Sequence, residues 1–148
     1  MSCVFCAIAD GHLPAHTIHE DEHFLVLLDI FPLRPAHLLI VARGHAPFLA
    51  DLPNPARDAL LALAARMSRV LYASDPGVQG INLLLNDGPV ANQHVPHLHL
   101  HLLPRRRGDL MALCWRILTR FLPQARRRLD ARLAREAEML RSALQRES

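Results

Sequence analysis

The chain has 148 residues, of which 51% are hydrophobic, so it is long enough for one domain with a buried core and too apolar to be disordered. The formal net charge of +3 favours anionic ligands but is too small to indicate nucleic-acid binding. No apolar run is long enough to span a membrane, and the N-terminus lacks the features of a secretory signal. We therefore expect a cytoplasmic protein with no membrane partner.

The first half of the chain predicts a short helix, a hairpin and one central strand. Residues 4–8 form a short apolar segment that we interpret as helical. Residues 18–20 and 24–28 flank the polar pair Asp21-Glu22, which is typical of a hairpin. Two prolines then predict an irregular crossing. Residues 38–41 are uniformly apolar, which predicts a central strand.

The second half predicts one long helix followed by two strands. Asn54-Pro55 is a favourable helix start, with Asn as the capping residue, and the apolar periodicity continues to the Asp-Pro-Gly turn at residues 75–77. Residues 81–85 read as a buried strand, followed by a turn at residues 86–89. Residues 97–103 alternate strictly and form the clearest strand.

After Pro104 the chain becomes helical. We predict a helix over residues 110–122, a break at Pro123, and a final helix with one apolar stripe. The stripe consists of Leu129, Leu133, Ala137, Leu140 and Leu144. The expected organisation is a catalytic domain over residues 1–109 with a helical extension, residues 110–148, packed on it.

The strand at residues 97–103 reads His-Leu-His-Leu-His-Leu-Leu. Since side chains alternate across a strand, His97, His99 and His101 share one face and the leucines supply the other. Imidazole can be nucleophile, acid, base or metal ligand near neutral pH. The alternatives are three surface histidines on a half-buried strand, or a zinc site if the strand bends.

This strand resembles the signature of the histidine triad family of nucleotide hydrolases and transferases, His-x-His-x-His-x-x with x apolar. The similarity extends in order and spacing from about Cys3 to about Asp109, through residues 3–6, 28–32, 35–37, 43–45 and 86–105. The resemblance implies an α+β fold with a mainly antiparallel sheet of about five strands and one long helix. It also implies a homodimer.

The resemblance assigns the chemistry. His99 matches the nucleophile that attacks the α-phosphorus of a purine nucleotide and forms a nucleotidyl-histidine. His101 and His37 match histidines beside the phosphate, and Gln93 and Asn86 match polar residues that hold phosphate and ribose.

The nucleoside-binding positions also follow from the resemblance. Asp29 matches the carboxylate that binds ribose hydroxyls. Phe5, Ile8, Leu27 and Ile30 match apolar positions around the base, and for Ile8 and Leu27 a plain core role is equally compatible with the pattern.

A zinc site also follows from the resemblance. Cys3-x-x-Cys6 alone cannot complete a four-ligand site. Many bacterial members with this pair complete it with the histidines at the positions of His45 and His97. We therefore expect a structural zinc, and no cofactor for the chemistry itself. Cys114 is expected in the core.

Two departures leave the subclass open. Asn92 stands where the family usually has Gly, although Asn tolerates unusual backbone angles, and His94 stands where Ser or Thr is common near the leaving group. Both nucleoside phosphoramidases and dinucleoside polyphosphate hydrolases fit. A non-catalytic nucleotide-binding protein and a zinc-dependent hydrolase are the alternatives from other classes.

Overall fold

The computed structural model describes residues 3–121 and 126–147, without the side chains of residues 126 and 127. The predicted break at Pro123 lies outside the described residues. The elements in chain order are α1 (Val4–Ala9), β1 (Thr17–Glu20), β2 (Phe24–Leu28), β3 (Leu38–Ala42), a 3-10 turn (Leu49–Asp51), α2 (Asn54–Ser74), β4 (Gly80–Leu85), a 3-10 turn (Pro89–Ala91), β5 (His99–Arg105), α3 (Leu110–Thr119) and α4 (Arg126–Glu147).

The five strands form one antiparallel sheet in the order β1-β2-β3-β5-β4. With the long helix α2, this confirms the α+β fold. β3 is central, as its apolar sequence predicts, and all five of its residues are buried. In its register with β5, Val41 faces His99 and Leu39 faces His101. The register therefore fixes where the two histidines stand on the sheet.

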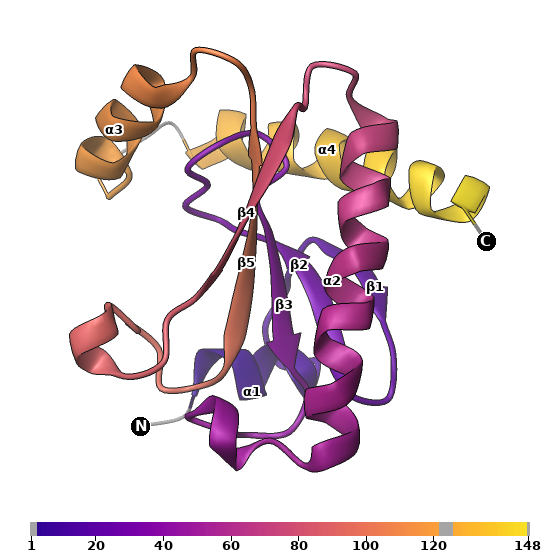
Figure 1. Ribbon diagram of the computed structural model, residues 1–148, viewed down its shortest axis with the longest axis vertical. Coiled ribbons are helices and arrows are strands. Elements are labelled where there is room, and N and C mark those ends of the chain that lie inside the picture. Colours follow the sequence, from indigo (N-terminus) through magenta and orange to yellow (C-terminus); the bar gives the residue numbers. More distant parts are fainter. Residues whose placement is uncertain (1–2, 122–125, 148) are drawn as a thin grey trace.

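The two faces of the sheet are covered differently. Leu98, Leu100 and Leu102 share one hydrophobic core with buried residues of α2 and α4. Figure 1 shows α2 running along the sheet while α4 crosses near its upper end. The opposite face carries a smaller cluster that includes Phe5 of α1 and Leu27 of β2. The histidines lie on this second face, where Phe5 contacts the ring of His99.

The final helix packs as its apolar stripe predicts. Leu133, Ala137, Leu140 and Leu144 are buried in the same core as α2, and Leu129 packs against it. The helix contacts both α2 and β1. The extension therefore contributes to the main core, and its boundary after Asp109 stays a prediction. Across the described ranges, no helix is both long and apolar enough to span a membrane.

Two local predictions were wrong, because the hydrophobic pattern of a segment does not show which elements lie next to it in the fold. Strand β4 is an edge strand rather than a buried one, so Leu83 and Leu84 are 46% and 45% exposed. Cys114 is exposed rather than in the core, because α3 buries only Leu113.

Two boundaries also differ from the predictions. Asn54 is the first residue of α2 rather than its capping residue, which is Pro53, and the Asn54 side-chain oxygen accepts a hydrogen bond from Arg57. β5 begins at His99, so His97 lies in the bend before the strand. This bend allows His97 to serve a different site from the other two histidines.

Candidate active site

His99 is held in one tautomer by the backbone. Its Nδ1–H donates to the carbonyl oxygen of His97 at 2.8 Å, and the residue is only 7% exposed. A neutral imidazole that donates from Nδ1 keeps a lone pair on Nε2. His99 therefore presents one unprotonated, oriented nitrogen, which is what a nucleophile requires.

His37 and His101 form a hydrogen-bonded pair beside His99. His37 Nε2 and His101 Nδ1 are 3.0 Å apart, and the rings of His99 and His101 are 5.0 Å apart. The backbone N–H of Leu33 donates to His37 Nδ1 at 3.2 Å. His37 must then carry its proton on Nε2 and donate it to His101 Nδ1, which leaves the His101 proton on Nε2.

Burial keeps this pair neutral. Desolvation lowers the pKa of His37 to about 4, although the charge of Asp29 opposes the shift. Desolvation, with the nearby His37 and His99, lowers the pKa of His101 to about 3. At neutral pH the pair is therefore not an imidazolium, and the one N–H that it leaves free for a ligand is His101 Nε2–H.

Asp29 is buried and fully engaged. Its Oδ1 accepts from the backbone N–H of Phe31 at 2.7 Å, and its Oδ2 accepts from Arg120 at 3.2 Å. The same Oδ2 lies 3.4 Å from His37 Nδ1. The carboxylate that the sequence assigned to ribose therefore stands next to the histidine pair.

The structure brings together three of the four apolar positions assigned to the base. Phe5 and Leu27 belong to one buried cluster, and Ile8 packs against it. The Phe5 ring lies 5.1 Å from the His99 ring. Ile30 is instead 57% exposed and lies outside this cluster.

The loop before β5 is held by Gln93. Its Oε1 accepts from the N–H of Gly88 at 3.0 Å, and its Nε2 donates to the carbonyl of Pro47 at 2.7 Å. Asn86 donates to the carbonyl of Asn92. Asn92 adopts a left-handed backbone with φ of 69°, so it tolerates the angle, as expected where the family usually has Gly. In this conformation Gln93 and Asn86 shape the loop.

The four predicted metal ligands converge. Cys3 Sγ and His97 Nδ1 are 3.3 Å apart, as are Cys6 Sγ and His45 Nδ1, and the two Nδ1 atoms are also 3.3 Å apart. A tetrahedral zinc with ordinary bond lengths separates such atoms by about 3.3–3.6 Å. The donor set and its spacing therefore fit a zinc ion.

The orientation of His97 supports the same assignment. Its Nε2–H donates to the carbonyl of Ala42 at 2.6 Å, so its Nδ1 lone pair faces the two cysteines. Metal-bound histidines commonly donate their second ring N–H to such a backbone oxygen. His97 is therefore turned toward the cysteines, whereas His99 and His101 are turned toward His37.

Helix α3 brings residues to the site that the sequence analysis missed. Arg120 pairs with Asp29, and Arg116 donates to the carbonyl of Pro32 at 2.9 Å. Phe121 contacts the rings of Phe31 and His94. The available signal was the spacing of the two arginines, which lie four residues apart and so share one face of an otherwise apolar helix.

Two arginines of the run at the end of β5, Arg105 and Arg106, pair with side chains of the fold. Arg105 donates to the buried Asp109 and to Asn82. Arg106 pairs with Asp75. In the second run, the side chains of Arg126 and Arg127 lie outside the described residues.

Comparison with known proteins places this geometry in a family. Residues 10–108 match the family model described as the HIT domain. A solved structure described as a Zn-bound histidine triad family protein, from Mycobacterium smegmatis, is 37% identical, with a TM-score of 0.80 over 99% of this chain and 95% of that one.

Two curated relatives have named activities. An adenosine 5'-monophosphoramidase of Candida albicans is 33% identical over 108 residues, which cover 71% of each protein. An adenylylsulfatase of Arabidopsis thaliana is 31% identical over 144 residues, which cover 97% of this chain and 68% of that protein.

Proposed function

The chain belongs to the histidine triad (HIT) family, and on that premise we propose that it is a hydrolase or transferase that cleaves nucleotides at the α-phosphorus through His99. The observation that carries the proposal is the bond from His99 Nδ1–H to the His97 carbonyl, which leaves Nε2 free to attack. The neutral, hydrogen-bonded pair of His37 and His101 lies beside it and would supply His101 Nε2–H as a donor to a phosphoryl oxygen.

The reaction has two displacements. His99 Nε2 forms a bond to the α-phosphorus, and the bond to the leaving group breaks, with the electron pair going to that group. Water or another acceptor then attacks the phosphorus, loses a proton, and displaces neutral His99. Donation from Nδ1–H to a carbonyl stabilises the positive charge that the imidazole carries between the two steps.

The nucleoside would lie against the face of the sheet that carries the histidines. Phe5, Ile8 and Leu27 offer an apolar surface for a purine base next to His99. Asp29 would accept from ribose hydroxyls, which requires a change in its present contact with Arg120. Gln93 and Asn86 would shape the phosphate loop through Gly88 and Asn92.

We assign the cluster of Cys3, Cys6, His45 and His97 to a structural zinc. The ion would tie α1 to the bend before β5, and His99 takes no part because it is not among the four residues whose ligand atoms converge. This separation favours a structural metal over a zinc-dependent hydrolase that uses all three histidines as ligands. Thiolate ligands persist in a reducing compartment, which is consistent with the expected cytoplasmic location.

A homodimer remains part of the proposal. The support is the edge position of β4, which presents Leu83 and Leu84 together with unpaired backbone groups. Pairing of β4 with a second copy of the chain would cover both the two leucines and the unpaired backbone groups. Light scattering on the purified protein at micromolar concentration should give twice the monomer mass; the monomer mass would overturn this part.

Turnover assays on wild type and His99→Ala test the proposed function. The substrates are an adenosine phosphoramidate and diadenosine tri- and tetraphosphates, which cover the two subclasses left open by the sequence. We expect release of adenosine monophosphate by the wild type and a loss of at least about 10³-fold in the variant. Tight nucleotide binding without turnover would instead support a non-catalytic nucleotide-binding protein.

A further inference from the structure

The connection between β2 and β3 orients the histidine pair. The backbone N–H of Asp29 donates to the carbonyl of His37 at 2.9 Å and closes the connection into a loop, which we call the 29–37 loop. Within it, the backbone N–H of Leu33 donates to His37 Nδ1 at 3.2 Å. The His37 ring therefore takes its orientation from the conformation of this loop.

Ala36 gives the 29–37 loop an unfavourable backbone conformation. Its φ is 57°, in the left-handed region, and it directly precedes His37. A residue with a Cβ is disfavoured there, and such an angle persists only where surrounding groups enforce it. The Ala36 N–H donates to Glu136 Oε2 at 3.0 Å, across 100 positions of the sequence. Helix α4 therefore contacts the residue next to His37.

Helix α4 fixes the Glu136 carboxylate. The Glu136 side chain is 13% exposed, and its Oε1 lies 3.1 Å from Arg132 Nε, one turn earlier. The same helix buries Leu133, Ala137 and Leu140 in the main core, so it cannot withdraw without exposing them. Figure 1 shows α4 beside the 29–37 loop. An ionised acceptor on an anchored helix makes a strong hydrogen bond to a backbone N–H.

Helix α3 contacts the same loop at a second point. Arg116 Nε donates to the carbonyl of Pro32 at 2.9 Å. The two contacts, at Pro32 and at Ala36, lie on either side of Leu33 in the chain. Both come from helices outside residues 10–108, the part of the chain that matches the family model.

Two proton arrangements are open to the histidine pair. In the first, Leu33 N–H donates to His37 Nδ1, His37 Nε2–H donates to His101 Nδ1, and His101 Nε2–H is free for a ligand. In the second, His37 Nδ1–H donates to Asp29 Oδ2, which already lies 3.4 Å away. His37 Nε2 then accepts from His101 Nδ1–H, and His101 Nε2 becomes an acceptor. Both arrangements hold the same number of protons, so Leu33 N–H selects the first.

We propose that Glu136 is a positioning residue for the histidine pair: by holding Ala36 in its left-handed conformation, it keeps Leu33 N–H on His37 Nδ1 and so keeps His101 Nε2–H as the donor to substrate. The inference rests on the proposed function, in which this donor meets a phosphoryl oxygen. It gives the C-terminal extension a role in the site, although Glu136 touches neither histidine nor substrate.

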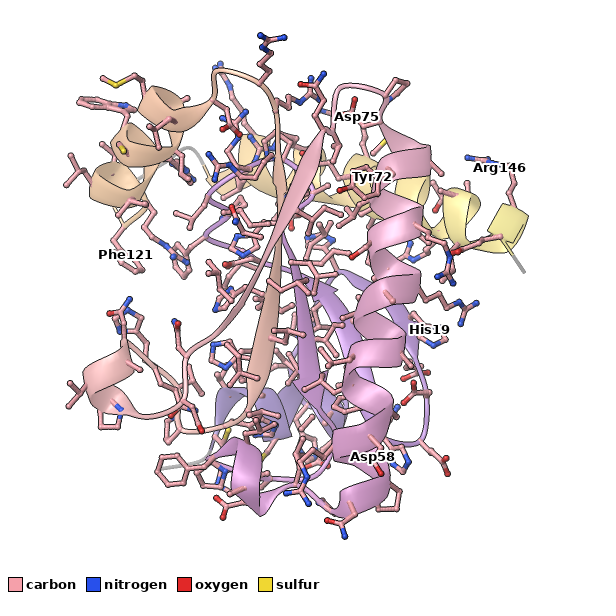
Figure 2. The ribbon with its side chains drawn as sticks, in the orientation of Figure 1. His19, Asp58, Tyr72, Asp75, Phe121 and Arg146 are labelled. Atoms are coloured by element: carbon pink, nitrogen blue, oxygen red, sulfur yellow. The ribbon has the colours of Figure 1, made fainter. Side chains whose placement is uncertain are left out.

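The variants are chosen to separate positioning from stability, and all are made in the full chain. Glu136→Ala removes the acceptor. Ala36→Gly removes the need for it, because glycine adopts the left-handed region without a Cβ penalty. The matched control is Glu138→Ala, on the same helix with a side chain 74% exposed. A second control, Asp58→Ala, removes an exposed carboxylate near the lower end of α2, far from α4 (Figure 2).

Steady-state kinetics use whichever adenosine 5'-phosphoramidate or diadenosine polyphosphate the wild type turns over fastest. We expect Glu136→Ala to lower kcat at least about 10-fold with little change in KM, because a donor to the transition state is lost. In the Ala36→Gly background the same change should cost less than about threefold. Both controls should match wild type. Equal losses in the two backgrounds, with thermal unfolding showing folded protein, would overturn the proposal.

Glu136→Gln guards against a Glu136→Ala protein that does not fold. The glutamine keeps the volume and an acceptor oxygen but loses the charge, so its kcat should lie between those of wild type and Glu136→Ala. It replaces Glu136→Ala in both backgrounds and in the spectroscopy if that variant is unfolded, with a smaller loss expected and the same comparison deciding the outcome.

Nitrogen-15 NMR of the histidine rings tests the proposal without turnover. The signals are assigned by their loss in His37→Gln and His101→Asn. We expect Nε2–H tautomers for both rings in wild type and in Ala36→Gly, and a shift of both toward Nδ1–H in Glu136→Ala. This shift in a wild type without turnover would leave the positioning proposal standing while the proposed function fails. Unchanged tautomers in folded Glu136→Ala would overturn the positioning proposal alone.

Discussion

The cysteine–histidine cluster of Cys3, Cys6, His45 and His97 and the pair of His37 and His101 lie on the same face of the sheet. Each contributes one histidine two residues from His99, His97 before it and His101 after it. In the cluster, the His97 Nδ1 lone pair faces Cys3, Cys6 and His45, because its Nε2–H is committed to Ala42. In the pair, the Leu33 N–H and the His37 N–H each meet a ring lone pair. The first arrangement offers four ligand atoms to a cation, whereas the hydrogen bonds of the second are made within the protein.

This difference shows that the roles of the histidines depend on the backbone groups they contact, and not on the residue type alone. The carbonyl of Ala42 leaves His97 with a free Nδ1, whereas the carbonyl of His97 leaves His99 with a free Nε2. Asp29, His37 and His101 also lie close enough to hold a metal. The two histidines are nevertheless hydrogen-bonded to each other and Asp29 is paired with Arg120, so we expect zinc in the first cluster only.

Removal of the cysteine ligands is the change with the largest expected effect. Cys3→Ser with Cys6→Ser should abolish zinc binding and lower the free energy of unfolding by several kcal/mol, because a structural metal binds only the folded chain. The kcat of the folded fraction should change little.

Metal analysis, thermal unfolding and turnover check this prediction together. His12, on the turn after α1 and exposed, provides the control variant His12→Asn. Loss of turnover in step with loss of zinc, in protein that is still folded, would assign the metal to the chemistry.

Breaking the histidine pair should cost activity rather than stability. His101→Asn places an amide oxygen where it can accept from His37 Nε2–H, so the fold should survive. It should reduce kcat about 10²-fold, because a polarised N–H donor to the phosphoryl group is lost. Steady-state kinetics, with zinc content and Tm measured in parallel, distinguish an effect on the histidine pair from an effect on the zinc cluster. A fall in Tm without a fall in kcat would contradict the assignment.

Acidification should produce a smaller effect on stability. The pKa values of His37 and His101 are lowered to about 4 and about 3 in the folded protein, from about 6.5 when unfolded. Below pH 6.5 the unfolded chain therefore binds more protons, and stability falls as pH drops toward 4. Asp109, whose pKa is lowered to about 2 by its bond to Arg105, contributes only at still lower pH.

Denaturant unfolding between pH 7.5 and 4.5 measures this slope. Both the wild type and His101→Asn are studied without zinc, so that metal release does not contribute, and His97, whose pKa is lowered by burial, contributes to both proteins. The variant should lose less stability than the wild type across the interval. Equal slopes would show that the His101 ring is not held neutral by burial.

The sequence predicted most of the elements because their apolar periods are local. Residue spacing alone predicted the strand of alternating histidines and leucines, the long helix α2 and the apolar stripe of the final helix. The grouping of Cys3, Cys6, His45 and His97 came from resemblance, since no local pattern joins them. The edge position of β4 and the exposure of Cys114 depend on which elements become neighbours.

Arg120 shows why part of the site could not be predicted. It meets Asp29 across 91 positions of the sequence, through a helix outside the matched family region. The next residue, Phe121, contacts Phe31 and His94, which also come from distant loops. Only the three-dimensional packing of α3 brings these residues together.

The most direct test of the central claim is mass spectrometry of the protein quenched during turnover. Wild type and His99→Ala are mixed with an adenosine 5'-phosphoramidate or phosphosulfate and denatured at alkaline pH, which preserves a phosphorus–nitrogen bond. We predict an adenylyl group on the peptide that contains His99, absent from the variant. Turnover by the wild type without this adduct, or an adduct that persists in His99→Ala, would contradict His99 as the nucleophile.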